Sequence, residues 1–257
     1  MYSQINSPVS ESVQAQSQAQ AESTQTEAPS QSAASSKASS NQAQVTPSGQ
    51  DTASEVYAVS AYVGQPDDWR LLLANRNNIV KNYAPKVKQF DRRYCQNDVK
   101  YYFDERAFDD AMNMINAALD DGIKLIILSS YRTYERQQTL YNNKVNYYLN
   151  KGYSASSAKT HAATVVAVPG TSDHNLGLAI DFNYLEQKDE NSKELKWLRA
   201  NAERFGFVMR YPKGKENVTG VIYEPWHYRY VGTENAERMN ELNMCLEEYA
   251  EYLSKNT

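Results

Sequence analysis

The chain has 257 residues, of which 41% are hydrophobic and 23% are charged, and its formal net charge is −4. A nucleic-acid-binding domain usually carries an excess of basic residues, whereas this chain has a small net negative charge. In addition, no apolar run approaches the roughly 18 residues of a transmembrane helix. We therefore expect no nucleic-acid partner and no transmembrane segment.

The first predicted segment, residues 1–56, has a composition that argues against a folded core. Ser, Gln and Ala make up 33 of its 56 residues, it contains no Leu, and Tyr2 is its only aromatic residue. Such a segment buries too little apolar surface to offset the entropy lost on ordering. We predict a disordered stalk or linker. No secretory signal is visible before Tyr57, so we expect that an export signal or anchor is missing from the start.

Residues 57–257 are predicted to form one domain of about 200 residues, long enough for a substantial core. They hold 19 of the 20 tyrosines and all the tryptophans and phenylalanines. From Glu105 apolar residues recur at helical spacing, and Gly122 marks the end of this helix. A short buried strand at 125–128 follows, and Arg132 lies directly after it.

Thr133 is the predicted N-cap of a helix that extends to about Asn150. The remaining predicted elements are a second helical stretch at 157–164, a turn at 169–171, a loop at 172–174, a strand at 178–182, an amphipathic helix at 195–205, extended segments at 207–210, 218–223 and 227–231, and a terminal helix capped by Thr233. Helices and short strands mix without a regular βαβ alternation. The pattern predicts an α+β fold with a small, largely antiparallel sheet flanked by helices.

Two short stretches, 172–181 and 224–227, carry two of the chain's three histidines, each close to a carboxylate. His174, Asp181 and His227 can supply three nitrogen or oxygen ligands to zinc and leave the fourth position to water, as in catalytic rather than structural sites. Glu224 precedes His227 by three residues, which makes it the candidate base beside the metal rather than a ligand.

The spacing of the first two ligands sets a geometric condition. His174 and Asp181 are seven residues apart, and an odd separation on a regular strand would point them to opposite faces. Gly177 must therefore allow a bend if both side chains bind one ion.

One histidine and both cysteines are left outside the site. His161 lies in a helical stretch with no carboxylate nearby, and we predict a structural role for it. Cys95 and Cys245 lack the close partner expected of a zinc knuckle. We expect them to be buried free thiols, with a disulfide between them as the alternative in an exported protein.

Three motifs occur in the order typical of the VanY/LdcB group of zinc carboxypeptidases: Ser-Ser-Tyr-Arg-Thr at 129–133, Ser-x-His-x-x-Gly-x-Ala-x-Asp at 172–181, and Glu-Pro-Trp-His-Tyr-Arg-Tyr-Val-Gly at 224–232. Residues 65–252 resemble this family. The resemblance implies the fold shared by Hedgehog signalling domains and DD-peptidases, with one Zn²⁺ per chain held by His174, Asp181 and His227. It also implies that Glu224 is catalytic. Asp173 departs from the Glu that commonly precedes the first ligand.

Enzymes of this family remove the C-terminal D-alanine from peptidoglycan stem peptides. The resemblance therefore implies a D-alanyl-D-alanine carboxypeptidase, with an L,D-carboxypeptidase that acts on tetrapeptide stems as the alternative. An exopeptidase must recognise a free carboxylate, which a guanidinium does with two parallel hydrogen bonds. Arg132 is the candidate for this substrate-binding and catalytic role, supported by Ser172 and Gln138 as neutral donors.

Two other kinds of function remain open on the residues alone. A non-catalytic, zinc-stabilised module that binds wall peptides would not need Glu224. An endopeptidase that cuts within the stem would not need Arg132 as a carboxylate clamp. The resemblance further implies a bacterial protein that acts outside the cell or at its surface, and we expect a monomer.

Overall fold

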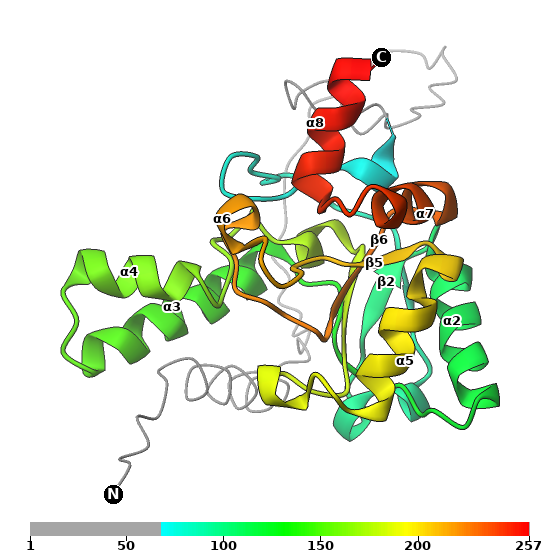
Figure 1. Ribbon diagram of the computed structural model, residues 1–257. Helices are drawn as coiled ribbons and strands as arrows, with labels where there is room; N and C mark the ends of the chain where they lie inside the picture. The colour runs from blue at the N-terminus through cyan, green and yellow to red at the C-terminus, as the bar shows by residue number, and fades with distance from the viewer. Residues whose placement is uncertain (1–67, 257) are drawn as a thin grey trace, which may run out of the picture.

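The structure is a computed structural model that describes residues 68–256 (Figure 1). The predicted stalk, residues 1–56, lies outside the described residues. The helices are α2 (Phe108–Asp120), α3 (Tyr134–Asn150), α4 (Ala155–Ala163), α5 (Lys193–Asn201), α6 (Glu216–Thr219), α7 (Thr233–Glu241) and α8 (Leu246–Asn256). The strands are β1 (Val87–Gln89), β2 (Tyr102–Asp104), β3 (Ile127–Ser129), β4 (Ala179–Phe182), β5 (Phe207–Met209) and β6 (His227–Tyr230).

The centre of the fold is a four-stranded sheet in the order β3-β4-β6-β5, in which neighbouring strands are antiparallel. β1 and β2 form a separate antiparallel pair. The α+β prediction with a small antiparallel sheet is therefore confirmed. In the β4–β6 pair, Asp181 is directly opposite His227. Opposed residues project from the same face of an antiparallel pair, so this register brings two of the predicted ligands together.

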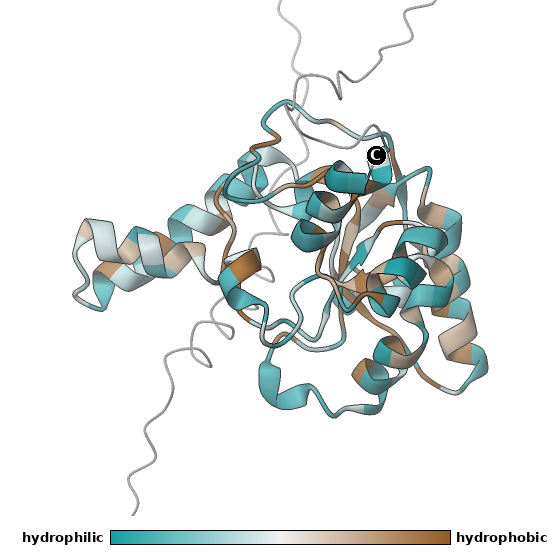
Figure 2. Ribbon diagram, turned by 45° about the horizontal axis from the view of Figure 1, so that its top comes forward, coloured by the Kyte–Doolittle hydropathy of each residue, from teal (hydrophilic) through white to brown (hydrophobic). Residues whose placement is uncertain are grey.

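The main core lies between the central sheet and helices α2 and α5. Buried residues recur every three or four positions along α2, as on an amphipathic helix: Phe108, Ala111, Met114, Ile115 and Ala118. They pack in one cluster with Leu195 and Leu198 of α5 and with strand residues such as Ile180 and Phe207. Figure 2 shows hydrophobic colour along the inner strands and mostly hydrophilic colour on the outward surfaces of the helices.

Helices α3 and α4 pack against each other as a hairpin that projects from the rest of the molecule (Figure 1). The predicted N-cap is confirmed, because the Thr133 side chain accepts a hydrogen bond from the backbone N–H of Arg136. Tyr148, Ala158 and Ala162 form a small core within the hairpin. The chain that leaves α4 then passes along the site described below.

The C-terminal part differs from its prediction. One terminal helix was predicted, but the structure has two, α7 and α8, because Asn243 between them adopts a left-handed conformation with a φ of 50°. Both helices contribute to one apolar cluster, through Met239 and Leu246. The cap of α7 is Gly232 rather than Thr233.

Three further observations bear on the sequence predictions. The segment predicted as extended at 218–223 begins within a short helix, α6, which Gly220 ends in a left-handed conformation. Cys95 and Cys245 are both buried and free. Among the described residues, no helix has the length and apolar character needed to cross a membrane.

Candidate metal centre

The bend required between the first two ligands is present. His174 lies in a 3₁₀ turn, Asp173–Leu176, and its backbone N–H donates to the Ser172 hydroxyl. Gly177 ends the turn in a left-handed conformation with a φ of 70°, which glycine adopts without steric cost. As a result, His174 Nε2 lies 3.2 Å from Asp181 Oδ2.

The protonation state of His174 suits a metal ligand. Its Nδ1 lies 2.7 Å from the backbone oxygen of Ser130. Because a carbonyl oxygen can only accept, Nδ1 carries the proton and Nε2 keeps its lone pair. Burial lowers the pKa of His174 to about 4. The imidazole is therefore neutral at pH 7, the form that binds metal ions.

The ligand atoms of His174, Asp181 and His227 all lie within 4.8 Å of one another, and the three side chains are buried. His227 Nδ1 is 3.0 Å from Asp181 Oδ1, an oxygen that accepts no hydrogen bond within residues 68–256. Burial opposes ionisation of Asp181, but the adjacent imidazoles outweigh it and hold the pKa below its usual value. Two imidazole nitrogens and one carboxylate oxygen match the ligand set of a catalytic zinc site.

Glu224 reaches the same site from the turn before β6. The His227 backbone N–H donates to the Glu224 carbonyl at 3.2 Å, with Pro225 in the second turn position that suits its fixed φ. This turn brings Glu224 Oε2 to 3.5 Å from His227 Nδ1. Burial, and then the charge of Asp181, raise the pKa of Glu224 well above its usual value, against the opposing effect of Arg132. A carboxyl group tuned in this direction is suited to proton transfer.

The Arg132 guanidinium is buried beside the three ligands. Its Nη2 donates to Asp181 Oδ2 at 3.3 Å, its Nε to Ser129 Oγ at 3.0 Å, and its Nη1 to Gln137 Oε1 at 2.9 Å. Each terminal nitrogen keeps a second N–H, since a guanidinium has five donors. Arg132 can therefore hold a further carboxylate while its own position is fixed by the protein.

The glutamine beside Arg132 is Gln137, whereas Gln138, the predicted neutral donor, is exposed. Gln137 is fully buried and also donates to the Ala167 backbone oxygen at 2.7 Å. Helical phase explains the difference, because Gln137 shares the buried face of α3 with Leu140. Ser172, the other predicted donor, lines the site cavity.

The cavity at this centre has a volume of about 30 Å³. It is lined by Arg132, Ser172, His174, Asp181, Tyr211, Glu224, Trp226 and His227, together with the chain at 163–167 and Val221. Tyr211 is a lining residue that the sequence left unassigned, and its ring centroid lies 4.9 Å from that of His227. Every predicted metal ligand, Glu224 and Arg132 thus face one cavity, while His161 lies in α4, outside it.

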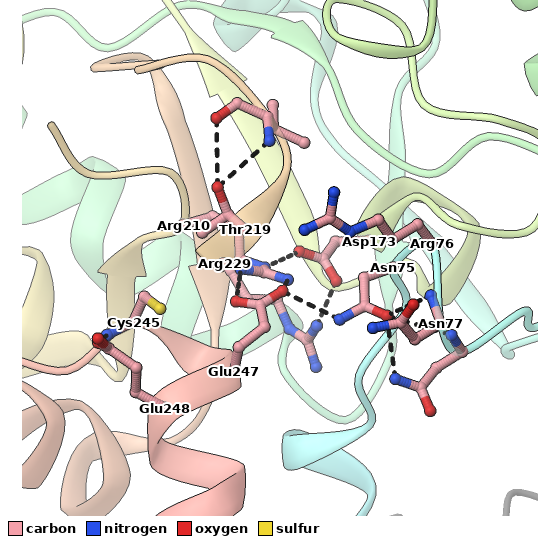
Figure 3. Close-up of polar contacts among 12 residues, drawn as sticks. Asn75, Arg76, Asn77, Asp173, Arg210, Thr219, Arg229, Cys245, Glu247 and Glu248 are labelled. Carbon is pink, nitrogen blue, oxygen red and sulfur yellow. Dashed lines mark hydrogen bonds and ion pairs between the residues drawn. The ribbon is translucent and has the colours of Figure 1, made fainter. Parts of the chain in front are cut away.

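A buried charge network of Asp173, Arg210, Arg229 and Glu247 supports the turn that carries His174 (Figure 3). The two Asp173 oxygens each accept a hydrogen bond of 2.6 Å, one from Arg210 Nε and one from Arg229 Nη1. Arg210 also donates to both oxygens of Glu247, at 2.7 and 2.6 Å. The two positive and two negative charges balance, and Asp173 is fixed at both oxygens next to the first ligand.

Asp173→Asn is expected to lower the free energy of unfolding by about 3–5 kcal/mol, the usual cost of leaving a buried charge unpaired. Urea denaturation followed by circular dichroism measures this change. Asp109→Asn is the matched control, because its pair with Lys88 is exposed and contributes little. A loss below about 1 kcal/mol in Asp173→Asn would show that the network does not stabilise the fold.

The chain is similar to known proteins in both sequence and structure. Residues 100–233 match the family described as VanY, D-alanyl-D-alanine carboxypeptidase. The chain is 42% identical over 186 residues to a D-alanyl-D-alanine carboxypeptidase of Enterococcus faecalis. The aligned region covers 72% of this chain and 67% of the relative.

Two solved structures also resemble the chain. One is a zinc complex of the vancomycin resistance D,D-pentapeptidase VanY, 42% identical with a TM-score of 0.62, covering 71% of this chain and 99% of the other. The second is the LD-carboxypeptidase LdcB, which is 32% identical with a TM-score of 0.53. The match covers 73% of this chain and 78% of the LdcB chain. The matched region contains Arg132, all three ligand residues and Glu224. The chain therefore belongs to the VanY family of D-alanyl-D-alanine carboxypeptidases, which are zinc peptidases.

Proposed function

We propose that this chain removes the C-terminal D-alanine from peptidoglycan stem peptides that end in D-Ala-D-Ala. The observation that carries the proposal is the convergence of His174, Asp181 and His227 with a non-ligand carboxyl, Glu224, and a guanidinium, Arg132, on one cavity. Because peptidoglycan lies outside the cytoplasm, we also propose that the enzyme acts outside the cell or at its surface.

Zinc bound by His174, Asp181 and His227 would lower the pKa of water and polarise the scissile carbonyl. Glu224 takes a proton from the attacking water and passes it to the leaving amine of the terminal D-alanine. Its buried position, with Oε2 3.5 Å from His227 Nδ1 but outside the group of three ligand residues, supports this role. The raised pKa favours the second of these transfers, in which Glu224 acts as an acid.

Arg132 binds the terminal carboxylate of the substrate through its remaining N–H groups. Gln137 and Ser129 hold the guanidinium in place. Gln138, which was predicted as a neutral donor to the substrate, is exposed instead. Ser172 lines the same cavity, and its hydroxyl can donate to the substrate while accepting from His174.

An L,D-carboxypeptidase is the second candidate, supported by the 32% identity to LdcB. The decisive experiment offers zinc-loaded protein two sets of defined muropeptides, ending in D-Ala-D-Ala or in a single D-Ala, with and without a chelator. Loss of one alanine from the first set alone, read by mass spectrometry, supports the proposal, and loss from the second set supports L,D activity. An internal cut would indicate an endopeptidase, and no cut would indicate a binding module.

Arg132→Ala is expected to reduce kcat/KM on a D-Ala-D-Ala peptide by about 100- to 1000-fold, because removing one partner of a buried charge pair costs on the order of 2–5 kcal/mol. The zinc content should stay near that of the unchanged protein. Steady-state kinetics and metal analysis measure both quantities.

Arg136→Ala is the matched control for this variant, since Arg136 is also in the 132–138 stretch but does not line the cavity. We expect its kinetics to stay close to those of the unchanged protein. Near-normal turnover by Arg132→Ala would remove Arg132 from the substrate site.

A further inference from the structure

A second cavity, of about 330 Å³, adjoins the metal centre. The two cavities share five wall residues: Ala163, Thr164, Ala167, Tyr211 and Val221. The first cavity is small, whereas the second has the size of a ligand pocket. A stem peptide that presents its last residue to the metal centre must extend away from it, and the second cavity offers the adjoining space.

The second cavity is lined by Arg76 and by uncharged residues of the types Asn, Thr, Tyr, Ala, Val and Gly. No ion pair involving Arg76 occurs among residues 68–256, and no acidic side chain lines this cavity. Its Nη2 donates to the Asn217 backbone oxygen at 3.4 Å. The cavity therefore presents a positive charge without a counter-charge from its own walls.

The position of Arg76 is built into the local structure. Its guanidinium packs against Gly220, where an added Cβ would lie 3.0 Å from Cζ. The preceding residue, Asn75, accepts from the backbone N–H groups of Asn77 and Asn78 at 3.0 and 3.1 Å. Asn75 also donates to Glu247 at 3.1 Å, which joins this loop to the buried charge network (Figure 3). The exposed guanidinium thus packs on Gly220, and the loop that carries Arg76 is anchored through Asn75.

We infer that the second cavity binds the part of the stem peptide upstream of the scissile bond, and that Arg76 selects stems with a free carboxylate there. This inference rests on the proposed function. Arginine pairs with carboxylates through two parallel hydrogen bonds, and an uncompensated arginine in a neutral pocket favours an anion. Two groups of peptidoglycan stems have this chemistry: the α-carboxylate of γ-linked D-glutamate and the side-chain carboxylate of diaminopimelate.

Four synthetic substrates, all ending in D-Ala-D-Ala, test the inference. The first is diacetyl-L-Lys-D-Ala-D-Ala, which has no upstream carboxylate. The second and third are pentapeptide stems with L-Lys that contain either D-glutamate or its amide, D-isoglutamine. The fourth contains D-isoglutamine and diaminopimelate. The readout is the ratio of kcat/KM values between the stems with and without an upstream carboxylate, measured for the zinc-loaded full chain.

We expect the unchanged enzyme to favour a carboxylate-bearing stem over the lysine stem with D-isoglutamine by about 5- to 20-fold, the effect of one charge-assisted hydrogen bond that is partly exposed. The second and fourth substrates reveal which carboxylate is responsible. In Arg76→Gln the ratio should fall to about 1, and Arg76→Lys should retain part of it because the charge remains. Arg92→Gln, which also removes one exposed arginine but does not line either cavity, should keep the full ratio.

A ratio near 1 in the unchanged enzyme would overturn the inference while leaving the proposed function intact, because the first substrate would still be cleaved. An equal loss on all four substrates in Arg76→Gln would also overturn it, since Arg76 would then act through the fold. Failure to cleave any of the four would refute the proposed function and the inference together.

Discussion

Glu224→Gln is expected to reduce turnover of a D-Ala-D-Ala peptide by about 1000-fold, within the range that a positioned acid–base group contributes. The substitution keeps the size of the side chain and removes its ability to accept and return a proton. Glu224 lies 3.5 Å from His227 Nδ1 but outside the cluster of three ligand atoms. The zinc content should therefore stay at about one ion per chain, as metal analysis can measure.

The two readouts separate two roles for this carboxyl group. Loss of zinc together with activity would make Glu224 a ligand and reverse the assignment. Retained activity would mean that another group transfers the proton. Glu105→Gln is the matched control, because Glu105 is exposed and lines neither cavity.

Replacing His227 by Ala is expected to remove both the zinc and the activity. His227 is directly opposite Asp181 in the sheet, so the substitution removes one of the three side chains that converge on the metal position. Mutation of a residue that only hydrogen-bonds to a metal ligand lowers metal affinity or activity by about 10- to 100-fold. Loss of a ligand itself should lower metal affinity by more than this. Dialysis against a chelator followed by titration with zinc measures the effect.

The unchanged protein should recover its activity when zinc is returned after chelation, whereas His227→Ala should not. His161→Ala is the matched control, because this histidine is exposed and packs against Tyr148 and Tyr153 in the projecting hairpin. It should bind zinc and turn over substrate normally. Full zinc content in His227→Ala would contradict the assignment of the three ligands.

The metal centre could be predicted from the sequence because its chemistry is concentrated in two short segments. Few residue types bind zinc. His174 and Asp181 are seven residues apart in one segment, and His227 is three residues after Glu224 in the other. The odd spacing also predicted a bend at Gly177, and in the structure this bend is a left-handed conformation. The strand pairing that places Asp181 opposite His227 was not predicted, because register depends on contacts between distant segments.

Other parts of the site depend on orientation and long-range packing, which residue type alone does not reveal. Gln137 and Gln138 are chemically identical, and only the helical phase set by Leu140 tells which one is buried. Tyr211 carries no motif of its own and reaches the cavity because β5 pairs with β6. Asn243 ends α7 through a left-handed conformation that asparagine adopts more readily than most residues, a signal present in the sequence but weak by itself.

The buried charge network has a consequence for how the protein folds. Asn75 and Glu247 are 172 residues apart in the chain, and Arg229 binds the backbone oxygen of Leu72 across 157 residues. Contacts between such distant residues form only after the entropy of closing long loops has been overcome. The two guanidinium contacts of Asp173 span 37 and 56 residues, and both arginines are also held by these longer-range contacts, so a partly folded chain lacks the full support of the turn that presents His174. Metal capture should therefore follow folding, with the completed scaffold selecting the ion.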